Sequence, residues 1–150
     1  MKMHRLTTTV KEREMNHYLK LSLLTLSLIF SQGTLAHTAE YLDTQTAPHD
    51  GQLRMAGMQH YELVVKPNAV TVYLTDHAGT KIPSSGATGT ATILSGKYKA
   101  NVKLTPAGDN IMKGTGKFAL TPDMKVVVSI ALPGQAAEQA RFTPLQKSKP

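Results

Sequence analysis

The chain has 150 residues, of which 41% are hydrophobic and 18% are charged, a composition typical of one globular domain and not of a disordered protein. It contains no cysteine, which excludes disulfide bonds, thiolate catalysis, thiolate metal sites and a lipidated N-terminal cysteine. Tryptophan is also absent, so a core must be built mainly from aliphatic side chains. The net charge of +7 would by itself favour a nucleic-acid partner.

An export signal explains part of this charge. The apolar run Leu21–Phe30 is shorter than the roughly 20 residues that span a bilayer, but it has the length of a signal-peptide core. Lys20 precedes it as the positive flank, and Thr34 and Ala36 have the spacing that a signal peptidase recognises. A buried helix is the alternative, but the run shows no periodic alternation of polar and apolar residues and no helix-capping signal. We therefore predict a signal peptide over residues 1–36 and a periplasmic protein with no stable membrane insertion after cleavage.

Two further observations concern this N-terminal segment. Met15 is an alternative start, because residues 16–20 then form a compact n-region and residues 1–14 become upstream sequence. The whole chain has 17 basic and 10 acidic residues, and residues 1–36 hold five of the basic and two of the acidic ones. Without this segment, 12 basic and 8 acidic residues remain, a net charge of +4. The remaining charges are scattered and form no dense run, so we expect no nucleic-acid partner.

Residues 37–47 show no sustained period and are predicted to be a flexible lead-in. Residues 48–145 are predicted to form one β domain, followed by a tail at 146–150. From Tyr61 onward, alternating patterns and turn signals recur at short intervals. The predicted strands are Tyr61–Lys66, Ala69–Asp76, Ala87–Leu94, Lys97–Thr105, Ile111–Leu120, Val126–Leu132 and Glu138–Thr143. About seven strands predict an all-β, antiparallel β-sandwich of Ig-like shape, with a small barrel as the second choice.

Several details of these strands can be predicted. In Ala69–Asp76 the apolar side chains Val70, Val72 and Leu74 share one face, which should be buried. Pro67-Asn68 and Ser95-Gly96 are predicted turns. The strand Ile111–Leu120 is interrupted by two glycines, whereas the nearly continuous apolar run Val126–Leu132 should be a central strand.

Catalytic motifs are scarce. The chain has no Gly-x-Ser-x-Gly elbow and no His-Glu-x-x-His, and the segment Gly86–Gly89 lacks the lysine of a phosphate loop. Asp76-His77 places an acid beside a histidine, but no nucleophile is arranged with them by spacing. We therefore expect no enzymatic activity.

Metal-binding residue types, by contrast, are clustered. His49, Met55, Met58 and His60 fall within twelve residues, and Glu62 shares a strand face with His60. Imidazole suits zinc, copper and nickel, whereas a thioether favours Cu(I). A loop could bring His49 and His60 together, which predicts a metal site. The alternative is that the methionines pack at the rim of the domain and His60 is an ordinary strand residue.

A second metal site is conceivable at the predicted new N-terminus. Cleavage after Ala36 would expose the amine of His37, and an N-terminal histidine can chelate copper through its amine and ring nitrogens. A histidine standing there by chance is the alternative, since a shift of one residue in the cleavage site removes the chelate.

Several short motifs occur in a recognisable order between residues 48 and 143. They are Pro48-His49-Asp50-Gly51, Ala56-Gly57, His60-Tyr61-Glu62-Leu63-Val64, Val70-Thr71-Val72-Tyr73-Leu74-Thr75-Asp76, Gly86-Ala87-Thr88-Gly89-Thr90-Ala91, Leu104-Thr105-Pro106-Ala107-Gly108-Asp109-Asn110 and Gln139-Ala140-Arg141-Phe142. In this order they resemble the small N-terminal β domain of periplasmic adaptor (membrane-fusion) subunits of heavy-metal cation efflux systems. That domain also occurs as free-standing exported proteins.

The resemblance implies a metal-handling or metal-sensing accessory module whose partners are periplasmic components of a cation efflux system. It carries over His49 and His60 as ligands, with Glu62 as a further candidate. Asp50 replaces the first glycine of the family's Pro-His-Gly-Gly, which would stiffen the loop or add an oxygen ligand. Met55 and Met58 are additions of this sequence and favour copper, so the expected metal ion is copper or zinc.

The same resemblance leaves an alternative open. No hairpin, lipoyl-like or barrel domain of a complete adaptor follows the β domain, so we expect a free-standing module that does not itself bridge a pump and an outer-membrane channel. Such a module could also be a metal-independent interaction protein whose exposed sheet edges pair with a partner strand.

Overall fold

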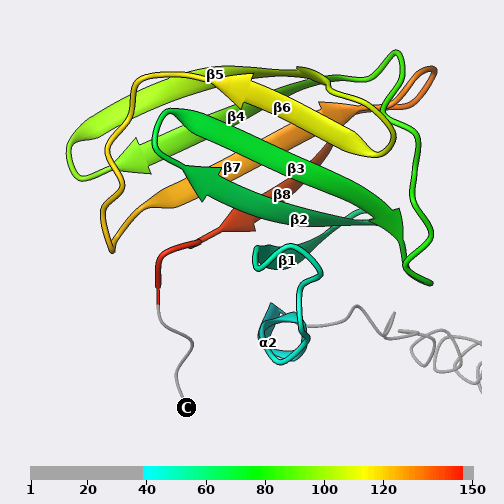
Figure 1. The fold of residues 1–150 in the computed structure, drawn as a ribbon, viewed down its shortest axis with the longest axis horizontal. Coiled ribbons are helices and arrows are strands. Elements are labelled where there is room, and N and C mark those ends of the chain that lie inside the picture. The colour runs from blue at the N-terminus through cyan, green and yellow to red at the C-terminus, as the bar shows by residue number, and fades with distance from the viewer. Residues whose placement is uncertain (1–38, 147–150) are drawn as a thin grey trace, which may run out of the picture. The chain divides into compact units, whose positions relative to one another are not determined.

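The chain divides after residue 36 into two units, and the computed structural model describes residues 39–146, which belong to the second. The predicted signal segment, the alternative start at Met15, His37 and residues 147–150 lie outside the described residues. The described part contains one short helix and eight strands (Figure 1). Their bounds are Ala39–Asp43 for α2, Gln52–Ala56 for β1, Gln59–Lys66 for β2, Ala69–Asp76 for β3, Thr88–Ser95 for β4, Tyr98–Pro106 for β5, Ile111–Thr115 for β6, Lys125–Ala131 for β7 and Glu138–Phe142 for β8.

All eight strands belong to one antiparallel sheet with the order β1-β2-β3-β6-β5-β4-β7-β8. The two ends of this order are joined, because the N–H of Thr143, directly after β8, donates to Oε1 of Gln52 in β1 at 2.8 Å. The sheet therefore curls into a nearly closed barrel, with β2 and β3 facing β7 and β8 across the interior (Figure 1). The all-β prediction is confirmed, and the small barrel describes the structure better than two separate sheets.

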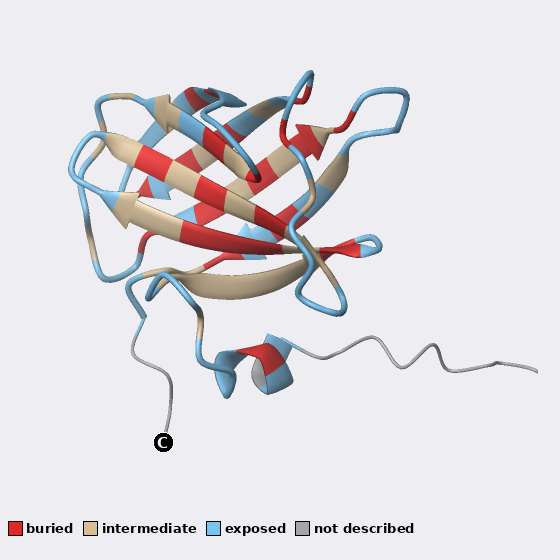
Figure 2. Ribbon diagram, turned by 45° about the vertical axis from the view of Figure 1, so that its right-hand side comes forward, coloured by how far each residue is buried: buried red, intermediate tan, exposed pale blue. Residues whose placement is uncertain are grey.

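The inward faces of the strands form the core, and buried residues alternate with more exposed ones along them (Figure 2). Val70, Val72 and Leu74 of β3 are fully buried, as their period-2 spacing predicts. The predicted central strand, β7, lies between β4 and β8 and buries Val126 and Val128. Burial of these aliphatic faces is the main source of the domain's stability.

Two elements were not predicted. The segment 37–47, predicted to be flexible, contains α2, whose Leu42 is 5% exposed. Asp43 at the end of α2 forms an ion pair of 2.6 Å with Arg54 of β1. Strand β1 itself is the eighth strand, joined to β2 by a two-residue turn in which Gly57 has a φ of +57°. Both elements are stabilised by contacts between separate segments, which local periodicity does not reveal.

Smaller differences concern strand ends. The hairpin between β4 and β5 turns at Gly96-Lys97, one residue later than predicted, because Ser95 pairs with Tyr98. Strand β6 ends at Thr115 and not at Leu120. In the described part of the chain, no helix has the length and apolar composition needed to cross a membrane.

Tyr61 provides a test of the barrel interior, since it lies on the inner face of β2 with no exposed surface. Burial, with a smaller contribution from the negative charge of Glu138, raises the pKa of its phenol from 10.0 to about 12. This contribution to stability is complete below pH 10 and is lost as the pH rises through about 12. We expect the free energy of unfolding to fall by about 2 kcal/mol across this window.

Denaturant titrations at several alkaline pH values measure this loss, and Tyr61→Phe is the control. The hydroxyl has no hydrogen-bond partner among the described residues, so its removal should be tolerated. The variant should be less sensitive to pH above 10 than the wild type. An equal alkaline loss in both proteins would contradict the assignment.

Candidate metal centre

The candidate residues gather on the outer face of the β2-β3 hairpin. The two strands pair so that Glu62 lies opposite Tyr73 and His60 lies opposite Thr75. Opposite residues of an antiparallel pair project from the same face of the sheet, and residues two apart on one strand share that face. The register therefore puts His60, Glu62 and Tyr73 on one surface, outside the barrel and beneath the segment that follows α2.

Glu62 is buried although it lies on this outer face. Its side chain is 4% exposed because the chain around His49 covers it. The oxygen Oε1 accepts hydrogen bonds from the backbone N–H groups of His49, at 2.7 Å, and Gly51, at 3.0 Å. The other oxygen, Oε2, lies 2.7 Å from Nδ1 of the His49 ring. One carboxylate thus holds both the main chain and the ring of His49.

This contact determines the chemistry of the His49 ring. A carboxylate can only accept hydrogen bonds, so Nδ1 carries the proton and Nε2 is the nitrogen that can bind a metal. The ring is also stacked on Tyr73, with centroids 3.6 Å apart and planes at 1°. The side chain is 43% exposed. Glu62 therefore fixes one ring nitrogen of His49 and Tyr73 packs against the face of the ring, while the side chain stays partly exposed to solvent.

A second pair of imidazoles lies on the same surface. The rings of His60 and His77 have centroids 4.7 Å apart and an interplanar angle of 50°. Both rings line a cavity of about 420 Å³ that also takes in His49, Glu62 and Tyr73. The structure thus brings together His49 and His60, which the sequence predicted as ligands, and adds His77.

His77 follows β3 in a turn that is organised by the preceding residue. Oδ1 of Asp76 accepts from the backbone N–H groups of Ala78 and Thr80, each at 2.8 Å. These bonds, with that of Thr80 contributing most, lower the pKa of the Asp76 carboxyl, and the neighbouring His77 adds a smaller effect. Asp76 therefore shapes the turn that carries His77.

The remaining predicted ligands are not among the residues that line the cavity. Met55 pairs with His60 across the β1-β2 ladder, and Met58 is 80% exposed in the turn between these strands, but neither lines the cavity. Asp50 has a φ of +58°, a conformation that favours glycine. Within residues 39–146, no three His, Asp or Glu side chains already converge on one point.

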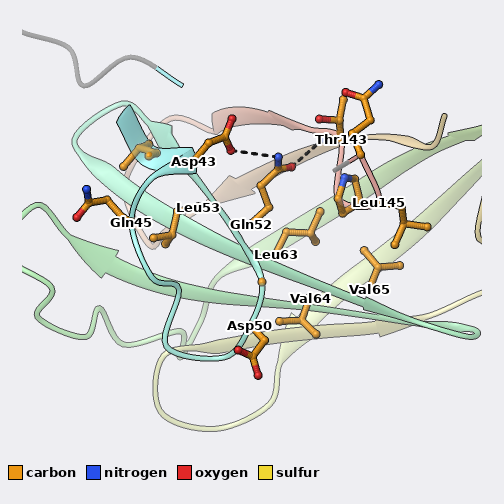
Figure 3. Close-up of a pocket in the computed structure, with 14 residues that line it drawn as sticks. Asp43, Gln45, Asp50, Gln52, Leu53, Leu63, Val64, Val65, Thr143 and Leu145 are labelled. Atoms are coloured by element: carbon orange, nitrogen blue, oxygen red, sulfur yellow. Dashed lines mark hydrogen bonds between the residues drawn. The ribbon is translucent and has the colours of Figure 1, made fainter. Parts of the chain in front are cut away.

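Asp50 instead lines a neighbouring groove of about 490 Å³, which shares Leu42, Gln45 and Leu53 with the histidine cavity. Figure 3 shows this groove, where Gln52 bridges Asp43 and Thr143. Its floor is formed by apolar side chains that include Leu63 and Val65, and no histidine lines it. The groove therefore supplies no imidazole for a metal ion.

Two residues of the site, Tyr73 and His77, were not predicted to belong to it. Tyr73 lies on the face opposite to Val70, Val72 and Leu74, as the alternation of its strand predicts, but its stacking on His49 could not be predicted because the path of residues 44–51 was unknown. His77 could have been found from the hairpin register: the turn Pro67-Asn68 aligns the end of β3 with the start of β2, next to His60.

Comparisons of the chain with known protein families, with curated proteins and with solved structures yield no significant match.

Proposed function

We propose that this protein is an exported metal-binding accessory protein that handles copper or zinc beside a heavy-metal efflux system. The metal would bind through Nε2 of His49 and through the ring of His60, and Glu62 would be the residue that positions His49. The observation that carries this proposal is the buried Glu62 carboxylate, which orients an exposed imidazole in a cavity that a second histidine also lines.

The Glu62–His49 pair matches the second coordination shell of metal sites. A metal-binding histidine almost always donates its other ring N–H to a carboxylate, a carbonyl or water, which sets the tautomer and the ring orientation. If Glu62 only capped the loop, its Oε1 would be enough, because this oxygen accepts the hydrogen bonds from both backbone N–H groups. The use of Oε2 on the His49 ring supports a role beyond loop structure.

The donors around the cavity also bear on the choice of metal. Imidazole nitrogens suit zinc and divalent copper, whereas thioether sulfur favours Cu(I). Because Met55 and Met58 do not line the cavity, the histidines support a divalent ion more than Cu(I). The proposed compartment and the efflux partner rest on the signal-peptide pattern and on the family resemblance.

The proposal is tested by calorimetric titration of the purified protein, in the form in which a bacterial host accumulates it, with Zn(II), Cu(II), Ni(II) and Cu(I). We expect stoichiometric binding at micromolar affinity or tighter, lost in the double variant His49→Ala/His60→Ala. Affinity should also fall below about pH 6.5, where imidazoles become protonated. N-terminal sequencing of the same sample checks export, with His37 expected as the first residue.

The matched control is Lys97→Ala/Lys99→Ala, which changes two exposed residues on another part of the barrel. It should bind metal as the wild type does. Undiminished binding in the double histidine variant would contradict the site. If no metal binds to the wild type, the metal-independent interaction module becomes the better account.

A further inference from the structure

We propose that His77 is the third imidazole ligand of this metal site, so that three separate segments of the chain each supply one histidine. The inference rests on the proposed function and adds a ligand to it. Its starting observation is the ring contact between His60 and His77, whose centroids are 4.7 Å apart within the cavity that His49 also lines.

The geometry of the ring pair suits a shared ion. Two imidazoles on one tetrahedral zinc, each with a metal–nitrogen bond of about 2.0 Å, place their bound nitrogens roughly 3.3 Å apart. Rings whose centroids are 4.7 Å apart and whose planes are tilted by 50° can reach this separation by side-chain rotation.

The backbone of His77 is already held in place for this role. Asp76 accepts hydrogen bonds from Ala78 and Thr80, and an isolated bridge between Thr75 and Lys81 closes the base of the turn. Holding a ligand in its bound backbone conformation before the metal arrives reduces the entropy lost on binding. His77 itself is exposed, which leaves a path for the ion.

The charges around the cavity allow a cation to enter. Lys81 is the lysine that lines the cavity, and its Nζ lies 2.7 Å from Oδ2 of Asp109, so its charge is partly offset. The Glu62 carboxylate behind His49 contributes a negative charge close to the proposed ion. Three neutral imidazoles backed by one carboxylate form a donor set suited to Zn(II) or Cu(II).

The experiment compares Zn(II) affinity of the protein, purified in the form that a bacterial host accumulates, in a His37→Ala background, which removes the predicted N-terminal chelate. The variants are His77→Ala, His77→Gln and the control Lys97→Ala. We expect each His77 variant to lower the Zn(II) affinity by more than about 10-fold, the lower bound for the loss of even an outer-shell partner. Electron paramagnetic resonance of the Cu(II)-loaded protein should show one nitrogen ligand fewer in both His77 variants.

The outcomes separate this inference from the proposed function. If the background protein binds Zn(II) and both His77 variants bind it equally well, with an unchanged Cu(II) nitrogen count, His77 is not a ligand and the function stands. If the background protein binds neither ion, the proposed function itself fails. Thermal unfolding of His77→Gln should match the background, because the side chain is exposed, and this excludes misfolding as the cause of lost affinity.

Discussion

Replacing Glu62 by glutamine is expected to lower metal affinity by about 10–100-fold while leaving most of the domain's stability intact. Glutamine keeps an oxygen that can accept from the backbone N–H groups of His49 and Gly51, as Oε1 of Glu62 does. In place of Oε2 it carries an amide group that donates. Facing this donor, Nδ1 of His49 must become the acceptor, so the ring proton moves to Nε2 and blocks the proposed metal-binding nitrogen.

The variant Glu62→Ala is the matched comparison, because it removes the loop cap and the ring contact together. Two backbone N–H groups and one ring N–H would lose a charged acceptor, which we expect to lower the free energy of unfolding by about 3 kcal/mol. Urea unfolding measures this change, and calorimetric titration measures the affinity. Equal metal affinity in Glu62→Gln and the wild type would show that Glu62 only stabilises the loop.

Gly114→Ala is expected to be among the most damaging single substitutions in the barrel. A Cβ atom at this position would clash with the backbone oxygen of Lys103 and would lie 2.7 Å from Cγ1 of Val102. A backbone oxygen within a strand cannot move away without disrupting its ladder, so β5 and β6 would have to separate. We expect a loss of about 3 kcal/mol and a fall in Tm of roughly 10 °C or more.

Gly116→Ala is the control for this substitution. Its nearest contact would be Cγ2 of Val102 at 2.7 Å, with the next atom at 3.8 Å. The one close atom belongs to a side chain and not to the backbone of a ladder, so the loss should be clearly smaller than that of Gly114→Ala. Thermal unfolding of the two variants compares them directly, and similar Tm values would contradict the close approach of β6 to β5.

Much of the barrel could be predicted because its strands alternate and its turns have recognisable residues. Strand β3 was predicted with the bounds that the structure has, since Val70, Val72 and Leu74 mark the inner face and Pro67-Asn68 marks the turn before it. Gly114 and Gly116 weakened the pattern of β6, and the structure explains why at least one is needed: there is no room for a side chain at Gly114.

The site was harder to predict than the fold, because its geometry depends on long-range contacts. His49 is oriented by Glu62, thirteen residues away, and by Tyr73 on the next strand. The lead-in that covers the site is held by the pair between Asp43 and Arg54. Such long-range contacts produce no periodic pattern of residues in the sequence. The register of β2 and β3, in contrast, follows from their short turn, and it would have placed His77 near His60.

The most direct test of the account is nuclear magnetic resonance of the histidine ring nitrogens in ¹⁵N-labelled protein during titration with Zn(II). Before metal is added, His49 should show a protonated Nδ1 and an unprotonated Nε2, as its contact with Glu62 requires. One equivalent of Zn(II) should shift Nε2 of His49 and the ring nitrogens of His60, while Nδ1 of His49 stays protonated. Shifts confined to His37, or none at any histidine, would contradict the proposed metal centre.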